Sequence, residues 1–567
     1  MELDTLRHSC SHIMADAVKR IYPNAKLAIG PAIDNGFYYD FDIPGGIKEE
    51  DLPKIEAEMK KIVNSNAPFV KEEWGKEQAL EYFTKKGETY KVELIKDLGD
   101  VQITVYKHGE FLDLCRGPHI RYTSAAKHFK LLSLAGAYWR GDEKNAQLTR
   151  IYGTCFPTKD ELEKHLKNIE EAKLRDHRIL GPQLGLMDIY HEEAGAGLVF
   201  YLPNGALLRR TIEDWEIKEH YKRGYQMVTT PHIMDKKLWQ TSGHWDYYQE
   251  NMYTIIKDNQ EYVLKPMNCP GHILIYKSQL RSYRDLPLRL FELGTVYRFE
   301  KSGALHGLLR VRGFTQDDAH IFCKKEDQRS EIEGVLDFVK YTMDKFGFKE
   351  YIAELSTRPE KFIGDKEDWD LAEKILEDIL KAKGINYQIN AGDGAFYGPK
   401  IDIKIKDALG RSWQCATVQL DYALPKRFNM VYRAASGEDV QPVMIHRVLF
   451  GSLERFLATL IEHYGGRFPL WLAPVQIAII TISQEVKEYA QQIKENLLNA
   501  GLRVEADLRD ETMQKKIRDK EMQKIPYILV VGNREKEEGT VSVRKSGKEN
   551  LGSMKTEDFI GMVKKEA

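Results

Sequence analysis

The sequence predicts a chain of several domains that mix α+β and α/β structure, with antiparallel strands in its central part. The chain has 567 residues, which is too many for one hydrophobic core and suggests about three domains. Residues 291–323 form two extended segments joined by a polar loop, as in an antiparallel hairpin. After residue 467, strand-like and helix-like segments alternate regularly, which is typical of an α/β domain.

Composition narrows the class of protein. Charged residues make up 30% of the chain and apolar residues 42%, which is normal for a soluble globular protein. The net charge is −2, so any nucleic acid would have to be bound by local basic patches. The six cysteines show no disulfide spacing, and the sequence shows no leader peptide and no apolar run long enough to span a membrane. These features predict a cytoplasmic protein.

The first 155 residues contain two pairs of potential metal ligands. A helix predicted over residues 4–22 places His8 and His12 one turn apart on one face, and Cys115 and His119 repeat the same spacing downstream. The two pairs could meet as a zinc site or as a metal-free hydrolytic pocket, and the residues alone leave both readings open. A charged helix predicted over residues 159–178 then connects this region to the next.

The second half of the predicted central hairpin has a period-two order. Side chains on one face of a strand lie roughly 7 Å apart at every second residue. That face would carry Arg310, Arg312, Phe314, Gln316, Asp318 and His320. Burying these groups without partners would be costly, so the face suits a polyanionic, aromatic and zwitterionic ligand better than a core. An ordinary amphipathic hairpin is the simpler alternative.

The C-terminal hundred or so residues predict an α/β domain. Predicted strands cover residues 475–482, 502–508, 526–532 and 540–547, with a helix starting at Ser483 and a basic helix over 511–524. Lys515, Lys516 and Arg518 of that basic helix are potential RNA contacts, although such a run is most often a solvated helix face.

Three stretches of the central region resemble the motifs of class II aminoacyl-tRNA synthetases, and in detail those of the threonyl-tRNA synthetase family. They are GALLRRTIEDWEIKEHYKRGYQMVTTPHI, YRFEKSGALHGLLRVRGFTQDDAHIFC and HRVLFGSLERF. The resemblance implies a class II antiparallel catalytic core with an N-terminal editing domain and a C-terminal anticodon-binding domain. The implied ranges are 1–155 for editing, 156–180 for a linker helix, 181–466 for catalysis and 467–567 for anticodon binding. The first stretch implies a homodimer, and the small N-terminal module usual in the family is not found here.

The resemblance also implies a zinc ion held by Cys269, His320 and His446, with one open coordination position. Such a metal would explain selectivity, because an apolar pocket separates threonine from valine by only about 1–3 kcal/mol. Zinc that takes both the amino group and the hydroxyl of threonine would penalise valine, and Asp318 would assist. Serine keeps the hydroxyl, so a second, editing site would be needed.

Other roles follow from the same resemblance. Arg298 would hold the α-phosphate and the carboxylate, Arg455 the adenine and γ-phosphate, and Phe314 would stack on adenine. Arg310 would lie near the outer phosphates, His244 would act as a general base near the tRNA terminal ribose, and Mg²⁺ would accompany ATP. Further residues implied for the substrate and adenylate pocket are Gln316, Tyr397, Lys400, Gln414, Gln419, Met267 and Ser452.

The two terminal domains receive implied residues as well. His8, His12, Cys115 and His119, with Asp113 and Lys91, would form an editing pocket that positions the mischarged ester and a water without a required metal. Arg544, Glu535 and Asn533 would read the anticodon.

The resemblance therefore implies an enzyme that activates threonine with ATP, transfers it to the 3′ end of tRNA(Thr) and hydrolyses seryl-tRNA(Thr). A prolyl enzyme is the nearest enzymatic alternative, and the predicted zinc ligands argue against it. A synthetase-like tRNA-binding or regulatory protein is the alternative from another class. It would be marked by the loss of Arg298, Arg455 or a zinc ligand, and all of these are present.

Overall fold

The computed structural model describes residues 2–99, 102–142, 144–407, 410–547 and 549–566. The chain divides into two compact units, residues 1–170 and 171–567.

The first unit is built on helix α1 (Leu3–Ile21), which packs against a sheet and against α2 (Leu52–Asn64). The sheet consists of β1 (Lys26–Leu27), β2 (Ala32–Ile33), β3 (Gly36–Asp42), β7 (His128–Tyr138) and β8 (Gln147–Phe156), with all pairs antiparallel. One face of α1 supplies Leu6, Cys10 and Ile13 to the core of this unit. The helix predicted at the N-terminus is therefore confirmed.

A smaller layer of the first unit carries part of the predicted editing pocket. It contains the antiparallel strands β4 (Val70–Trp74), β5 (Ile103–His108) and β6 (Phe111–Leu114) with helices α3 (Lys76–Lys85) and α4 (Thr89–Asp97). Asp113 lies in β6 and Cys115 follows directly, while Lys91 lies on α4.

The helix predicted over residues 159–178 is broken near its end. Helix α5 covers Lys159–Arg175, and a second helix, α6, covers His177–Gln183. Between them, Asp176 leaves the helical conformation and its side chain accepts a hydrogen bond from the backbone N–H of Arg178 at 2.8 Å. An aspartate in this position caps a new helix, which is why α5 does not continue.

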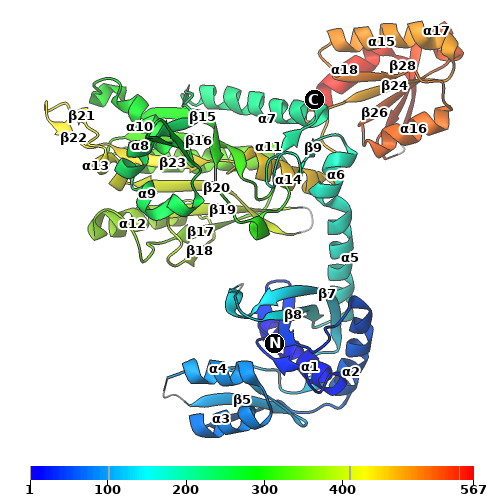
Figure 1. Ribbon diagram of the computed structural model, residues 1–567. Helices are drawn as coiled ribbons and strands as arrows, with labels where there is room; N and C mark the ends of the chain where they lie inside the picture. Colours follow the sequence, from blue (N-terminus) through cyan, green and yellow to red (C-terminus); the bar gives the residue numbers. More distant parts are fainter. Residues whose placement is uncertain (1, 100–101, 143, 408–409, 548, 567) are drawn as a thin grey trace. The chain divides into compact units, whose positions relative to one another are not determined.

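The second unit is organised by an eight-stranded, mostly antiparallel sheet in the order β11-β15-β16-β23-β20-β19-β17-β18 (Figure 1). The bounds are β11 (Gln226–Met227), β15 (Leu288–Tyr297), β16 (Gly313–Cys323), β17 (Tyr351–Ser356), β18 (Tyr387–Asn390), β19 (Lys400–Lys406), β20 (Ser412–Asp421) and β23 (Val443–Val448). The pair β15 and β16 confirms the predicted antiparallel hairpin.

The strand of that hairpin begins later than the period-two pattern predicts. Arg310 and Arg312 precede β16 and lie in its loop, so the prediction of one continuous strand face from residue 310 was wrong. His306 and Arg310 form an isolated bridge around Gly307, which has a φ of +47°. Alternation of residue types cannot detect such a turn, because it concerns side chains and not the backbone path.

Helices cover the faces of this sheet. Helix α14 (Leu453–Tyr464) packs against β16 and β20, and α11 (Gln328–Lys345) packs against β20 and β23. The long helix α7 (Pro203–Lys222) and α12 (Lys366–Ala382) also contribute to the core. Helix α10 (Cys269–Lys277) belongs to a separate apolar cluster with residues of β15, β16 and β23.

Shorter elements complete the part of unit 2 that precedes residue 467. They are β9 (Met187–Asp188), β10 (Phe200–Tyr201), β12 (Ile233–Asp235), α8 (Lys236–Ser242), α9 (His244–Tyr248), β13 (Thr254–Lys257), β14 (Gln260–Leu264), α13 (Ala423–Arg427), β21 (Tyr432–Arg433) and β22 (Asp439–Val440).

The C-terminal residues form a five-stranded sheet in the order β25-β24-β26-β27-β28. Its elements are β24 (Ile477–Thr481), α15 (Lys487–Asn499), β25 (Val504–Asp507), α16 (Met513–Met522), β26 (Tyr527–Val531), α17 (Asn533–Glu538), β27 (Thr540–Lys545), β28 (Glu549–Lys555) and α18 (Thr556–Glu566). The α/β alternation is confirmed, and α17 and β28 are additions that the sequence pattern did not indicate. Among the described residues, no helix combines the length and the apolar character that crossing a membrane requires.

Candidate functional site

A cavity of about 640 Å³ opens on one face of the large sheet. Nearly all the site residues predicted for the central domain line it. These are Met267, Cys269, Arg298, Arg310, Phe314, Gln316, Asp318, His320, Tyr397, Lys400, Gln414, Gln419, His446, Ser452 and Arg455. Residues from distant parts of the chain thus meet in one place.

Strand register explains how they meet. His320 of β16 pairs with His446 of β23, His446 pairs with Gln419 of β20, and Gln419 pairs with Lys400 of β19. Paired residues of neighbouring strands point to the same face. One row across four strands therefore brings these side chains to the cavity, and Asp318, Gln316 and Phe314 follow along β16.

Cys269, His320 and His446 converge at the floor of the cavity. Their ligand atoms all lie within 4.8 Å of one another, and all three side chains are buried. Cys269 is the first residue of α10, and His320 and His446 lie side by side on β16 and β23, with ring centroids 4.7 Å apart. Burial raises the pKa of the Cys269 thiol and lowers that of His320.

Each histidine has one ring nitrogen engaged behind the site. Nε2 of His446 lies 2.8 Å from Asp421 Oδ2, and Nδ1 of His320 lies 2.8 Å from His272 Nδ1. His272 in turn contacts Glu292 at 3.2 Å. Burial alone would raise the pKa of Glu292, but hydrogen bonds from His272 and a backbone N–H, with the charge of Lys265, lower it to about 2.

This donor set fits zinc. A thiol and two imidazoles are the ligands that Zn²⁺ prefers, and three protein ligands with an open position are typical of catalytic rather than structural zinc. The carboxylate behind His446 and the His272–Glu292 pair behind His320 fix the orientation of both rings, as partners of metal-bound histidines usually do. The remaining ring nitrogens, Nδ1 of His446 and Nε2 of His320, are the ones available to a metal.

Three arginines surround the upper part of the cavity. The guanidinium of Arg298 lies over the Phe314 ring at 5.0 Å, and its Nε donates to the Pro266 carbonyl at 3.2 Å. Arg455 donates from Nε to the Leu309 carbonyl at 3.2 Å, and burial lowers its pKa. Arg310 pairs with Glu300 at 2.9 Å. Ser452 caps helix α14 by accepting from the backbone of Arg455.

The opposite wall is a polar network. Tyr397 donates to Gln419 Oε1 at 3.0 Å, and Gln414 donates to Asp402 Oδ1 at 2.7 Å. Lys400 also pairs with Asp402. Sequence reasoning missed Asp402, and likewise Glu300 and Tyr248, which line the same cavity. For Asp402, the signal was its period-two spacing from Lys400 on the same strand.

His244 lies behind the cavity wall with its side chain buried. Its Nδ1 is 2.7 Å from Ser242 Oγ, its Nε2 is 2.9 Å from Met267 Sδ, and Cys269 Sγ is 4.0 Å from the same nitrogen. Burial and the nearby cations lower the pKa of His244 to about 3, so the ring is neutral near pH 7.

The first unit brings its own predicted residues together. The ligand atoms of His8, His12, Cys115 and His119 lie within 4.8 Å of one another. Cys115 Sγ is 3.3 Å from His8 Nε2 and 3.2 Å from His119 Nε2. Burial lowers the pKa values of the three histidines and raises that of Cys115 to about 12. These groups are therefore neutral near pH 7.

Asp113 and Lys91 lie directly beside this cluster and are buried. Lys91 Nζ is 2.6 Å from Asp113 Oδ1, and His12 Nδ1 is 3.3 Å from Asp113 Oδ2. Tyr39, which the sequence did not indicate, donates to the same Oδ2 at 2.5 Å and accepts from Lys91 at 2.9 Å.

In the C-terminal domain, several residues predicted to contact RNA form hydrogen bonds within the protein. Lys516 is buried, and its ammonium donates to the backbone carbonyl of Thr481 at 3.0 Å, so the prediction that it contacts RNA was wrong. The helix face that carries it packs on β24 and is not solvated. Glu535 accepts from the Gly532 backbone at 2.9 Å and from Ser542 at 2.8 Å, and Asn533 donates to Glu485 at 3.2 Å. Arg544 lies on β27, half-buried.

Comparisons with known families match three parts of the chain. Residues 253–464 match the tRNA synthetase class II core domain (G, H, P, S and T), and residues 476–566 match an anticodon binding domain. Residues 103–152 match the threonyl and alanyl tRNA synthetase second additional domain. The predicted class II architecture, with an editing-related domain and an anticodon-binding domain, is confirmed.

Curated relatives match over the full chain. Threonine–tRNA ligases of Pelobacter propionicus and Oleidesulfovibrio alaskensis are 55% and 54% identical to it, over 100% and 99% of this chain and 88% and 87% of theirs. A solved structure described as the RNA binding domain of threonyl-tRNA synthetase from Cryptosporidium parvum aligns with a TM-score of 0.67 and 40% identity, over 69% of this chain and 98% of that one. These matches favour a ligase over the non-catalytic alternative. The chain belongs to the threonine–tRNA ligase family of class II aminoacyl-tRNA synthetases.

Proposed function

We propose that the cavity on the large sheet is where threonine and ATP react, and that zinc bound by Cys269, His320 and His446 selects threonine. The observation that carries this proposal is the convergence of these three side chains, within 4.8 Å, at the floor of a cavity that is also lined by arginines. Beside the three side chains that would hold zinc lies Asp318, whose Oδ1 is 3.7 Å from His320 Nε2. Its carboxylate suits the ammonium group of an amino acid.

Zinc in this site would bind the amino group and the hydroxyl of threonine, and valine would leave that second position unfilled. Asn268 donates to Asp318 Oδ2 at 3.0 Å and so keeps the other carboxylate oxygen directed at the substrate. Met267, beside Cys269, contributes an apolar wall against the methyl group.

In the part of the cavity that would bind ATP, the arginines would bind the phosphates. Arg298 would hold the α-phosphate while the threonine carboxylate attacks it and pyrophosphate leaves, since fixed cations stabilise the charge that develops there. Phe314 would stack on adenine, with Arg455 over the other face and near the γ-phosphate. Arg310 would leave Glu300 to bind the outer phosphates with Mg²⁺, the metal that the class II core uses with ATP.

The remaining polar residues would hold the adenylate and the tRNA end. Gln316, Gln414, Gln419, Tyr397 and Lys400 line the cavity, and Ser452 lies at the start of the helix that carries Arg455. For His244 we infer a role near the tRNA terminal ribose other than the general base that the resemblance implies, because a ring with a pKa of about 3 is a weak base.

The first unit would hydrolyse the seryl-tRNA(Thr) that forms when serine is not rejected at the proposed zinc site. His8, His12, Cys115 and His119 lie close together and would position the mischarged ester and a water, and Lys91 and Asp113 orient His12 from behind. Because burial keeps the rings of His8, His12 and His119 and the thiol of Cys115 neutral near pH 7, we propose hydrolysis by positioning of the water and ester, without a required metal.

We further propose the domain ranges 1–155, 156–180, 181–466 and 467–567, which contain the family matches within single ranges. The C-terminal range would bind the anticodon of tRNA(Thr) through Arg544, Asn533 and Glu535, with a homodimer formed through α7 and a cytoplasmic location that suits six free cysteines.

Threonine-dependent exchange of pyrophosphate into ATP tests the central proposal. We expect exchange with threonine, about one zinc per chain by metal analysis and little exchange with valine. Exchange with proline instead, or full threonine activation in a protein stripped of zinc, would contradict it.

A further inference from the structure

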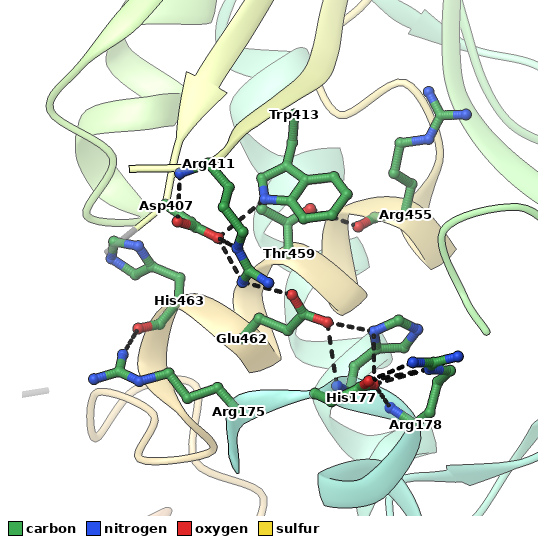
Figure 2. Close-up of polar contacts among 11 residues, drawn as sticks. Arg175, His177, Arg178, Asp407, Arg411, Trp413, Arg455, Thr459, Glu462 and His463 are labelled. Atoms are coloured by element: carbon green, nitrogen blue, oxygen red, sulfur yellow. Dashed lines mark hydrogen bonds and ion pairs between the residues drawn. The ribbon is translucent and has the colours of Figure 1, made fainter. Parts of the chain in front are cut away.

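A buried histidine outside the cavity connects two of its elements. His177, the first residue of α6, is fully buried, and its ring lies between helix α14 and the loop that joins β15 to β16. Figure 2 shows His177 beside Glu462 of α14, with Arg411 on the other side of that carboxylate. The function described above assigns no role to His177.

Hydrogen bonds fix the protonation of the ring. The backbone N–H of Leu308 points at His177 Nε2 from 3.0 Å, so Nε2 must accept. The proton therefore sits on Nδ1, which donates to Glu462 Oε1 at 2.6 Å. The backbone N–H of His177 donates to the same oxygen at 3.2 Å. Both ring nitrogens are thus engaged, one with each element.

The carboxylate of Glu462, which accepts from the His177 ring, is also held from its other side. Arg411 lies 2.6 Å from Glu462 Oε2 and also pairs with Asp407, which accepts from the indole of Trp413 at 3.1 Å (Figure 2). Asp176, His177 and Glu462 have the spacing of a metal site. However, Asp176 is paired with Arg178, and Glu462 is paired with Arg411 and His177. The cluster is a network of ion pairs and hydrogen bonds rather than a metal site.

The loop is held to α14 at two successive residues. Leu308 is held through His177 to Glu462, and the Leu309 carbonyl accepts directly from Arg455 at 3.2 Å. Arg310, one of the cations of the cavity, comes next in the chain. Glu462 and Arg455 lie on the same helix, so the backbone that leads into Arg310 is tied to the helix that carries Arg455.

The loop also fits the ring sterically. A Cβ at Gly307 would lie 2.1 Å from His177 Nε2, and the φ of Gly307 is +47°, where side chains are rarely tolerated. Only glycine at 307 therefore allows the Leu308 N–H to reach the ring.

We propose that His177 is a positioning residue for ATP. Acting through Leu308, it sets the place of Arg310 relative to Arg455 and so the geometry in which the outer phosphates are held. This inference rests on the proposed roles of those two arginines. It predicts a selective effect on the nucleotide, because the zinc site and its threonine-binding side chains lie on β16, β23 and α10, away from the loop.

Two substitutions separate the two hydrogen bonds of the ring. In His177→Asn, the amide nitrogen takes the place of Nδ1, which keeps the bond to Glu462 and leaves the Leu308 N–H without an acceptor. In His177→Gln, the amide oxygen can reach the place of Nε2 and restore that acceptor. We expect His177→Asn to raise the Kd for Mg–ATP about tenfold, the size of one lost buried hydrogen bond, and to change the Kd for threonine less than about twofold.

His177→Gln should recover most of the ATP affinity, as measured by calorimetry on the zinc-loaded protein. The matched control is His463→Asn on helix α14, next to Glu462, where the His463 ring packs on Phe348 at 4.5 Å. It should bind ATP as the parent does. Unchanged ATP binding in His177→Asn, a parallel loss of ATP and threonine binding, or no recovery in His177→Gln would each overturn the inference.

Gly307→Ala provides an independent test if His177→Asn does not fold. It leaves His177 intact but pushes the loop off the ring, so the same selective loss of ATP affinity is expected, and normal ATP binding would refute the inference. A parent protein that binds no ATP would contradict the proposed function itself. Normal ATP binding by both the parent and the variants would contradict only the role of His177.

Discussion

Two clusters of cysteine and histidine in this chain have similar donors and different surroundings. Cys269, His320 and His446 offer a thiol and two imidazoles, and His8, His12, Cys115 and His119 offer a thiol and three. In the first cluster, a carboxylate or a second histidine fixes each ring from behind. In the second, His12 Nδ1 lies 3.3 Å from Asp113 and His119 Nδ1 lies 3.0 Å from Ser9 Oγ, and Cys115 contacts the His8 and His119 rings.

The difference teaches that the donor set alone does not define a metal site. A metal-binding histidine needs its other nitrogen held by a partner, which orients the ring and strengthens the ligand. Asp421 does this for His446. In the first unit, Asp113 is shared among Lys91, Tyr39 and His12, so its charge is already balanced by a lysine. This difference supports the proposals that zinc binds to Cys269, His320 and His446 and that the cluster of His8, His12, Cys115 and His119 hydrolyses the ester without a metal.

The largest expected effect tests directly whether the two clusters differ in metal binding. Cys269→Ser should remove about one zinc per chain and lower threonine activation by at least about a hundredfold, because a ligand and its charge are lost. Cys115→Ser should leave zinc content and activation unchanged. Metal analysis and pyrophosphate exchange on both variants check this, and equal zinc loss from both would show that the two clusters are metal sites alike.

The next effect concerns the second cluster. His12→Ala, or His8→Ala, should leave threonine activation intact and slow the clearance of seryl-tRNA(Thr) by about a hundredfold, the lower range for losing a positioned acid–base group. Deacylation of preformed seryl-tRNA measures this. Serine clearance at the parental rate in both variants would mean that the first unit has another task.

A smaller effect tests the partner behind His446. Asp421→Asn keeps an oxygen for the backbone N–H groups of Ala423 and Leu424 but turns an amide toward His446 Nε2. We expect zinc affinity to fall about tenfold with little change in melting temperature. Competition with a chelator gives the affinity. An unchanged affinity would remove the distinction drawn between the clusters.

The smallest expected change is in the pH profile of serine clearance. Burial lowers the pKa values of His8, His12 and His119, so these rings stay neutral above those lowered values. Clearance should vary less than about twofold between about pH 6 and pH 8, with no inflection near 6.5. The unfolded chain binds these protons below about pH 6.5, and the folded chain binds them only at lower pH, so the free energy of unfolding should decrease as the pH falls below about 6.5. An inflection of the rate near pH 6.5 would contradict this.

Much of the site was predictable because strands alternate. The period-two order from Phe314 to His320 was sufficient to place those side chains on one face, and resemblance supplied the more distant Cys269 and His446. The same rule failed at Arg312. Arg312 lies in the loop before β16 and donates to the Glu300 carbonyl. Leu308, in the same loop, donates its backbone N–H to the ring of His177. Such contacts depend on the tertiary fold and leave no periodic trace.

The sequence also did not predict which residues hold the side chains of the site in place through hydrogen bonds. Asp421, His272 and Asp402 resemble ordinary polar residues until the fold brings them to a ring or an amide. Lys516 illustrates the opposite error, because a lysine in a basic helix reads as solvated and yet its ammonium caps the end of β24.

The cross-strand row from His320 to Lys400 bears on translational fidelity. A slip of one residue in any of these pairings would turn the slipped strand's side chains to the opposite face of the sheet. On β16, the groups proposed to select the amino acid and those proposed to bind the nucleotide share that face, so a slip would remove both together. A misassembled copy of this protein would then be inactive and would charge no tRNA. It would not be an active enzyme with reduced selectivity that attaches the wrong amino acid.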